Sequence, residues 1–214
     1  MMPSPIAEPG LILHDFALDL AGYTVRLAAS LVGKPLTVVD VDKVPGEEHL
    51  SDALLDLNPL ATLPILRSGD DVLCEPGAMV LHLCDGTPFA AESTKALDWA
   101  VTASALLSLF NQTRHELLFS QSRPIDDEAF GLARSQISAR IRTLEDYLSF
   151  KCNGDQLFLL GDGPSAADLL AFPAFAQSRD LGIEPEPYPA LRLWARRIRA
   201  LPGFIGMPGI PDYH

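Results

Sequence analysis

Residue types that could supply a nucleophile or bind a metal occur in this chain of 214 residues, but not in the spacing of a common catalytic motif. The cysteines, Cys74, Cys84 and Cys152, form no CxxC pair, and their odd number favours reduced thiols over a disulfide framework. The sequence contains no HExxH, no GxxxxGK(S/T), no GxSxG, and no GxGxxG after a predicted strand. We therefore expect no resident metal ion, no phosphate loop and no serine nucleophile of the hydrolase type.

One pair of side chains does have the spacing of a recognised local motif. Ser165 and Asp168 stand three positions apart where a helix is predicted to begin, as in a capping box. In that motif each side chain satisfies an otherwise unpaired backbone N–H at the helix start. Capping alone explains the pair, so we predict a structural role for it.

The charge balance argues against two classes of partner. A formal net charge of −12 opposes binding to a phosphate backbone. The basic residues Arg192, Arg196, Arg197 and Arg199 lie among apolar residues at helical spacing, which indicates a solvated helix face. No apolar run reaches the ~18 residues that a membrane span requires. We expect the protein to bind neither nucleic acid nor membrane.

The first ten residues lack the basic and apolar regions of a secretory signal. Together with the expectation of reduced thiols, this predicts a cytoplasmic protein.

The elements that must position any site begin with a strand, a helix and a second strand. The apolar run Leu11–Phe16 suits a buried strand, and helical spacing follows over Tyr23–Val32. Gly33 and Pro35 end that helix, and the β-branched segment Leu36–Val41 predicts another strand. A β–α–β unit of this length predicts that the two strands are parallel.

Four further segments complete the front half. They are a short helix over Ser51–Leu57, a strand over Pro64–Arg67, a returning strand over Val72–Cys74 and a helix over Gly77–Cys84. The predicted order is βαβαββα.

The back half shows helical periodicity only. Pro88 and the small, polar residues 89–94 form a predicted linker. Helices are then expected over roughly 95–120, 127–150, 166–177 and 189–201. We therefore divide the chain into an α/β domain, residues 1–87, and an all-helical domain, residues 88–214.

Two segments of the sequence resemble signatures of the glutathione transferase family. They are Asn58-Pro-Leu-Ala-Thr-Leu-Pro-Ile-Leu66 and Gly163-Pro-Ser-Ala-Ala-Asp168, and Phe16–Leu27 is similar to the first helix of bacterial members. The resemblance implies a thioredoxin-like front domain, an all-helical back domain and glutathione as co-substrate. It also implies a homodimer in which the front domain of one subunit contacts the back domain of the other.

In the subtype that the chain resembles, a serine hydroxyl after the first strand stabilises the glutathione thiolate, and the matching residue here is Asp19. An ionised carboxylate only accepts hydrogen bonds, and its charge would raise the pKa of a nearby thiol. Asp19 could instead act as a general base, or donate a proton if an apolar site keeps it protonated. It could also be an ordinary residue at the start of a helix.

The resemblance places a glutathione-binding groove along two further segments. Pro64 matches the cis-proline of thioredoxin-like folds, where the backbone of the preceding residue, Leu63, pairs with an extended peptide. Glu75 matches an acidic residue that binds the glutathione amino group, although acids are also common at helix starts. Pro76 replaces a serine and offers no donor, whereas the helix start from Gly77 still favours an anion.

The glycyl end of glutathione is expected near His49. The adjacent Leu50 replaces a residue that is usually basic in the family, so one cation is lost. A solvated loop histidine explains His49 equally well, because its charge at neutral pH is only partial.

The first long helix of the back domain is expected to line the electrophile pocket with Phe110, Asn111 and Arg114, and Leu107 and His115 are further candidates. An arginine there would favour an anionic substrate. Burial in the core alone explains an aromatic residue at this spacing.

The leading interpretation is a diverged transferase that adds the glutathione thiol to a small electrophile, in detoxification or in biosynthetic carbon–sulfur bond formation. The alternative is a non-catalytic binding or scaffold protein, because the departures at Asp19, Leu50 and Pro76 each remove a donor or a cation from one groove.

Overall fold

A computed structural model describes residues 10–119, 127–152 and 156–207, with only the backbone of residues 151 and 152. Residues 1–9, which bear on export, and the side chain of Cys152 lie outside the described part. Cys74 and Cys84 are free thiols.

The front half forms a mixed sheet of four strands with helices on both faces. Its elements are β1 (Leu11–Asp15), α1 (Leu20–Leu31), β2 (Leu36–Asp40), α2 (Asp52–Leu57), β3 (Ile65–Ser68), β4 (Asp71–Leu73) and α3 (Pro76–Cys84). The strand order is β2-β1-β3-β4, with β1 parallel to β2 and antiparallel to β3, and β3 antiparallel to β4. The predicted order βαβαββα and the parallel first unit are confirmed.

The back half is helical, as predicted. It contains α4 (Thr94–Phe119), α5 (Asp127–Cys152), α6 (Ala166–Ala176) and α7 (Pro189–Arg199). These bounds lie within two residues of the expected ones. The larger difference is in the front half, where α1 begins at Leu20 instead of Tyr23 because Asp19 caps its first turn.

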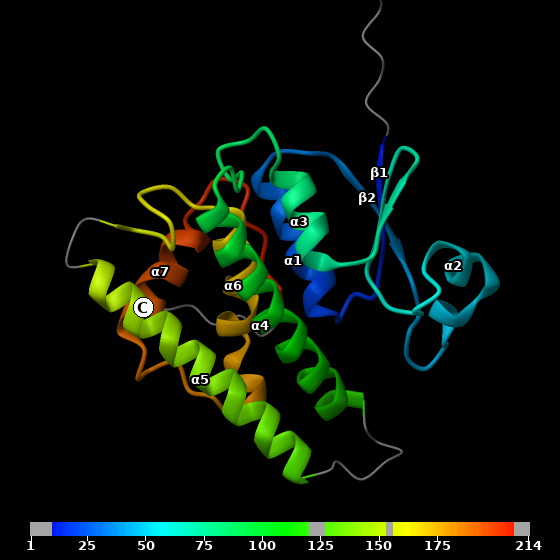
Figure 1. The fold of residues 1–214 in the computed structure, drawn as a ribbon. Helices are drawn as coiled ribbons and strands as arrows, with labels where there is room; N and C mark the ends of the chain where they lie inside the picture. The colour runs from blue at the N-terminus through cyan, green and yellow to red at the C-terminus, as the bar shows by residue number, and fades with distance from the viewer. Residues whose placement is uncertain (1–9, 120–126, 153–155, 208–214) are drawn as a thin grey trace, which may run out of the picture.

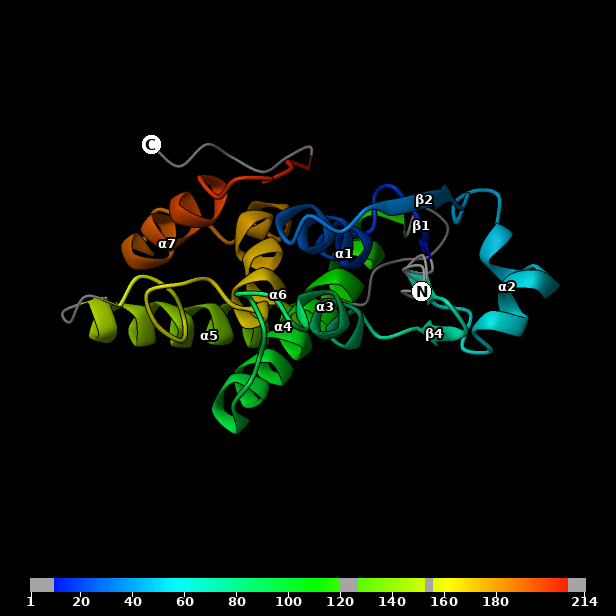
Figure 2. The same ribbon diagram turned by 90° about the horizontal axis from the view of Figure 1, so that it is seen from above.

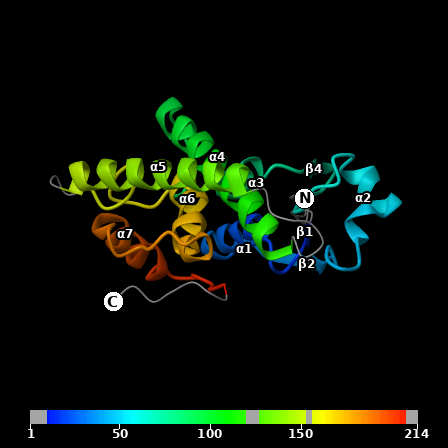
Figure 3. The same cartoon turned by 90° about the horizontal axis from the view of Figure 1, so that it is seen from below.

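The two halves are stacked so that α1 and α3 lie between the sheet and the helices of the back half, with α2 on the other face of the sheet (Figure 1). Seen from above and below, α6 lies in the middle of the helical half, with α7 on one side and α4 and α5 on the other (Figures 2 and 3). Every residue of α6 is buried. The helix therefore forms the centre of the hydrophobic core.

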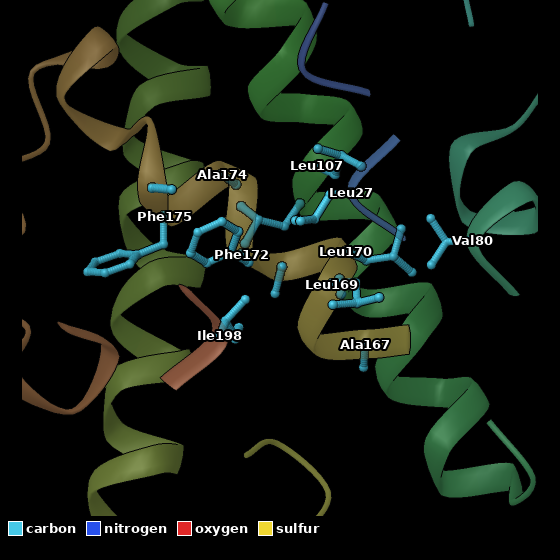
Figure 4. Close-up of a cluster of buried hydrophobic side chains, with 14 of the residues drawn as sticks. Leu27, Val80, Leu107, Ala167, Leu169, Leu170, Phe172, Ala174, Phe175 and Ile198 are labelled. Carbon is cyan, nitrogen blue, oxygen red and sulfur yellow. The ribbon is translucent and has the colours of Figure 1, made fainter. Parts of the chain in front are cut away.

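One hydrophobic cluster crosses the boundary between the halves (Figure 4). Side chains of α6 such as Leu170 and Phe172 pack in a cluster with Leu27 of α1, Val80 of α3 and Leu107 of α4. This shared core fixes α4 against the start of α1, where the candidate site lies.

The start of α6 is the capping box that the sequence predicts. Ser165 is the N-cap residue, and its N–H and Oγ–H donate to Oδ2 of Asp168 at 2.8 and 2.6 Å. Oδ1 of Asp168 accepts from the Leu159 N–H at 2.9 Å and the Trp194 Nε1–H at 2.8 Å. Asp168 is fully buried and joins α6 to α7 and to the loop before α6.

Two glycines allow helices to approach their neighbours closely. A Cβ on Gly22 of α1 would lie 1.6 Å from Oδ1 of Asp15, and one on Gly77 of α3 would lie 2.5 Å from Oγ of Ser104 in α4. The first approach places Asp15, at the end of β1, directly against the first turn of α1.

The arginines of α7 lie on its partly exposed side, while Leu191, Trp194 and Ile198 of the same helix are buried. This confirms the predicted solvated face. No helix in the described part of the chain is long and apolar enough to cross a membrane.

Candidate active site

A cleft of about 370 Å³ lies between the front half and α4. Its front wall consists of residues from the start of α1 and the loops beside it, namely Asp19, Ala21, Lys43, Ala61, Thr62, Leu63, Cys74, Glu75 and Pro76. Its back wall consists of α4 residues, namely Ser108, Asn111, Gln112, His115 and Glu116. The cleft brings together four of the residues expected to bind or activate glutathione: Asp19, Leu63, Glu75 and Pro76.

Asp19 lies at the start of α1 and is almost completely buried, with 3% of its surface exposed. Its Oδ1 accepts hydrogen bonds from the N–H of Ala21 at 2.8 Å, the N–H of Gly22 at 3.3 Å and Nδ2 of Asn111 at 3.1 Å. Its Oδ2 accepts none from the described residues. Asp19 is therefore a helix cap with one carboxylate oxygen uncommitted.

The pKa of the Asp19 carboxyl is raised, because burial penalises its charged form. The charge of Lys43 and the hydrogen bonds from Ala21, Gly22 and Asn111 oppose this rise without cancelling it. A carboxylate with a raised pKa is a stronger base than an exposed aspartate.

Asn111 connects α4 to the start of α1. Its Oδ1 accepts the N–H of Leu20 at 2.9 Å, while Nδ2 donates to Asp19. The N–H groups of Leu20, Ala21 and Gly22, which could otherwise face an anion at the helix start, are therefore already paired. An amide nitrogen has two hydrogens, so Nδ2 of Asn111 keeps a second donor.

Phe110 and Arg114, the other two residues expected in the electrophile pocket, do not line the cleft. Phe110 has no exposed surface and belongs to the core. Arg114 is 8% exposed, forms an ion pair with Asp180 and donates from Nη1 to the Leu18 carbonyl at 2.8 Å. Arg114 thus holds the loop before Asp19 in place, and its charge is paired inside the protein. Leu107 is also fully buried.

The Leu63–Pro64 peptide bond is cis, as the family resemblance implied, and Leu63 lines the cleft. Neither the N–H nor the C=O of Leu63 is hydrogen-bonded to another described residue. These two groups are available to an extended peptide that lies along the front wall.

Glu75 is exposed at the wall of the cleft and is the N-cap residue of α3. Its side chain makes no capping hydrogen bond, and no described cation forms an ion pair with it. Pro76 occupies the first position of the helix, where its missing N–H costs little. Gly77 is buried against α4 and does not line this cleft.

The cleft also contains His115, a candidate named from the sequence, and Lys43, which the sequence does not indicate. The pKa of His115 is lowered to about 4, chiefly by burial, with a further contribution from the positive charges of Lys43, His49 and Arg114. His115 is therefore neutral at physiological pH. His49 lies in a short 3₁₀ turn, Glu48–Leu50, near these groups but does not line the cleft.

Comparison with known proteins explains this arrangement. The family model described as "Glutathione S-transferase, N-terminal domain" matches residues 22–90, and "Glutathione S-transferase, C-terminal domain" matches residues 104–202. Glutathione S-transferase theta-2B of Homo sapiens is 30% identical over 207 residues, covering 88% of this chain and 82% of that protein. The chain belongs to the glutathione S-transferase superfamily.

This glutathione S-transferase superfamily member is also similar to an isomerase and to solved structures of the same fold. Maleylpyruvate isomerase of a Ralstonia species is 25% identical over 190 residues, which cover 84% of this chain and 88% of that enzyme. A solved structure of a possible glutathione S-transferase from Rhodopseudomonas palustris aligns with a TM-score of 0.81 at 24% identity, covering 94% of this chain and 91% of that one. The structure of Ure2p in complex with glutathione aligns with a TM-score of 0.79 at 20% identity, covering 92% of this chain and 93% of that one. The fold is therefore that of glutathione S-transferases.

Proposed function

We propose that the protein is a glutathione-dependent transferase that joins the glutathione sulfur to an electrophilic carbon. The observation that carries this proposal is the meeting of three uncommitted groups in one cleft: the backbone of Leu63, the carboxylate of Glu75 and Oδ2 of Asp19. The thiol, the amino group and the cysteinyl backbone of glutathione each have a partner among these three groups.

Glutathione lies extended along the front wall in this proposal. Its cysteinyl backbone pairs with the N–H and C=O of Leu63, and its amino group binds the carboxylate of Glu75. Its glycyl carboxylate lies toward Lys43 and His49, so that Lys43 supplies the cation that Leu50 does not. The thiol then lies at the start of α1, beside Asp19.

Asp19 acts as the general base in this account. The S–H bond breaks and its proton passes to Oδ2 of Asp19, whose raised pKa favours that transfer. The second N–H of Asn111 donates to the resulting thiolate, replacing the hydroxyl of the serine subtype. A sulfur electron pair forms the C–S bond, and in a substitution the leaving group departs with the electrons of the bond that breaks.

A second candidate function, a non-catalytic glutathione-transferase-like binding or scaffold protein, is favoured by a different observation. Asp19 already accepts three hydrogen bonds as a helix cap, and the N–H groups of the first turn are all paired. If capping is the whole role of Asp19, the cleft could bind glutathione without activating it.

Calorimetric titration with glutathione, paired with turnover of chlorodinitrobenzene, tests both candidates. The transferase proposal predicts saturable binding and a rate above the spontaneous reaction. Binding without turnover, for this and other electrophiles, would support the second candidate, and the absence of heat at millimolar glutathione would contradict the transferase proposal.

A matched pair of variants tests whether Glu75 binds glutathione. We expect Glu75→Gln to weaken glutathione binding by about tenfold, because the amino group loses a charged partner. Glu92→Gln makes the same change at an exposed linker residue away from the cleft and should leave the affinity unchanged. Equal affinities of the two variants would remove Glu75 from the site.

We also infer a homodimer, as the family resemblance implied. A mostly apolar groove between α3 and α4 is lined by small residues such as Ala78, Ala100 and Ala105, and Val101 beside them is 65% exposed. A second copy of the chain would cover these side chains. Light scattering should give the mass of a dimer, and Val101→Asp should yield monomers; a monomeric parent protein would contradict the inference.

A further inference from the structure

The back wall of the cleft is polar along its whole length. Its five residues, Ser108, Asn111, Gln112, His115 and Glu116, follow the spacing of one helix face. On the same helix, Ala103, Leu106 and Phe110 are buried in the core. Among the described residues that line the cleft, α4 contributes no apolar side chain.

The charges around this wall do not favour an anion. Glu116 lies on α4, and Asp19 and Glu75 lie opposite, whereas Lys43 is the single basic residue among the described lining residues. His115 adds no positive charge at neutral pH, as its pKa is lowered to about 4. The net charge of the whole chain, −12, acts in the same direction.

His115 has an unmet hydrogen-bonding capacity at this wall. Its Nε2 is buried and has no hydrogen-bond partner among the described residues, and its ring packs against Phe119 with centroids 4.8 Å apart. A neutral imidazole carries one donor and one acceptor nitrogen. His115 lines the cleft, so a polar ligand there can form a hydrogen bond with its ring.

We propose that the electrophile is an uncharged, polar molecule, such as one with an amide or conjugated carbonyl group, which hydrogen-bonds to Ser108, Gln112 and His115. This inference rests on the proposed transferase function and specifies its second substrate. An apolar electrophile would desolvate these side chains without giving them partners. An anionic one would lie beside Glu116, and Lys43, the single basic residue among the described lining residues, is paired with glutathione.

Three electrophiles with the same reacting carbon test the proposal. They are chlorodinitrobenzenes that carry a trifluoromethyl, a carboxamide or a carboxylate group para to the chlorine. The value of kcat/KM for each, with saturating glutathione, is divided by its spontaneous rate with glutathione. We expect the carboxamide to exceed the trifluoromethyl compound by about tenfold, the effect of one net hydrogen bond, and to exceed the carboxylate as well.

Each other outcome overturns a defined part of the account. Preference for the trifluoromethyl compound would overturn the polar substrate class while leaving the transferase function in place. Preference for the carboxylate would overturn the claim that the substrate is uncharged. Turnover of none of the three, with glutathione bound, would overturn the transferase function and this inference with it.

Substitutions on α4 test whether its cleft residues cause the preference for the carboxamide. Gln112→Leu changes an exposed residue and should reduce, by several-fold, the ratio of kcat/KM for the carboxamide to that for the trifluoromethyl compound. His115→Leu should reduce this ratio further. Gln136→Leu makes the same change as Gln112→Leu at an exposed position on α5 outside the cleft. An unchanged ratio in Gln112→Leu and His115→Leu would contradict the proposal.

Discussion

The starts of α1 and α6 each hold a buried aspartate that accepts several hydrogen bonds, yet the two sites differ in one respect. Both oxygens of Asp168 are occupied, by Leu159 and Trp194 on Oδ1 and by Ser165 on Oδ2. Asp19 accepts three hydrogen bonds on Oδ1 alone and lines a cleft.

This difference separates a structural carboxylate from a candidate catalytic one. Burial raises the pKa of both groups, so a shifted pKa does not distinguish them. What distinguishes them is access, since only the carboxylate with an uncommitted oxygen beside a cleft can exchange a proton with a ligand. The predictions below test this separation.

The largest effect is expected on activity at Asp19. Asn is as good a helix cap as Asp but is not a base, so Asp19→Asn should keep the fold and lower kcat/KM by about a hundredfold or more. Steady-state kinetics measure the loss, and the unfolding midpoint in urea checks the fold. Activity equal to that of the parent protein would reduce Asp19 to a cap.

At Asp168 we expect the opposite result, a loss of stability without a loss of activity. Asp168→Asn places an NH₂ group among four donors, and we expect it to lower the free energy of unfolding by about 3 kcal/mol. The activity per folded molecule should not change, because Asp168 does not line the cleft. A stable Asp168→Asn protein with lost activity would contradict the separation.

A smaller effect is expected from the packing below α1. Gly22→Ala would place a Cβ 1.6 Å from Oδ1 of Asp15 and should cost about 1–3 kcal/mol. Gly131→Ala is the matched control, because Gly131 is an exposed residue of α5 and a Cβ there would have no atom within 4 Å. This substitution should stabilise the protein by up to about 1 kcal/mol, since alanine favours a helix more than glycine does. Urea unfolding of both variants measures the difference, and effects of equal sign would contradict it.

The last effect concerns pH and Asp15, a second buried acid near the start of α1. The pKa of Asp15 is raised to about 7, chiefly by burial; Arg26, whose Nε lies 2.9 Å from Oδ2, opposes the rise, and the charge of Asp19 contributes to it. Because the folded pKa exceeds that of the unfolded chain, the stability that this group contributes is fully present near pH 4 and is lost as pH rises to about 7.

Asp15→Asn removes this contribution, so the fall in stability between pH 4 and 7 should be steeper in the parent protein than in the variant. Urea unfolding across that range measures the two slopes. His115, whose pKa is lowered, gives a slope of opposite sign in both proteins and cancels in the difference. Parallel curves would contradict the raised pKa of Asp15.

Much of the fold is predictable from the sequence because its signals are local. Apolar periodicity gives the order of strands and helices, and the Ser165–Asp168 spacing gives the start of α6. The cis-proline follows only from the family resemblance, since most X-Pro bonds are trans. The early start of α1 is harder to predict, because regular apolar spacing begins at Tyr23 whereas the helix is capped at Asp19.

The site is less predictable because it depends on which way a helix is turned. Phe110 and Asn111 are adjacent in the sequence but project about 100° apart, so packing of α4 places one in the core and the other in the cleft. The polar positions 108, 111, 112, 115 and 116, which share one helix face, are a usable signal. Lys43 offered none, because its loop meets the cleft only in the folded chain.

The ultraviolet absorbance of the thiolate in enzyme-bound glutathione tests the central claim most directly. With saturating glutathione at neutral pH, we predict a thiolate band in the parent protein and its loss in Asp19→Asn, with similar binding affinity. Equal thiolate bands in the two proteins would show that Asp19 does not take the proton, and the account of the site would then be wrong.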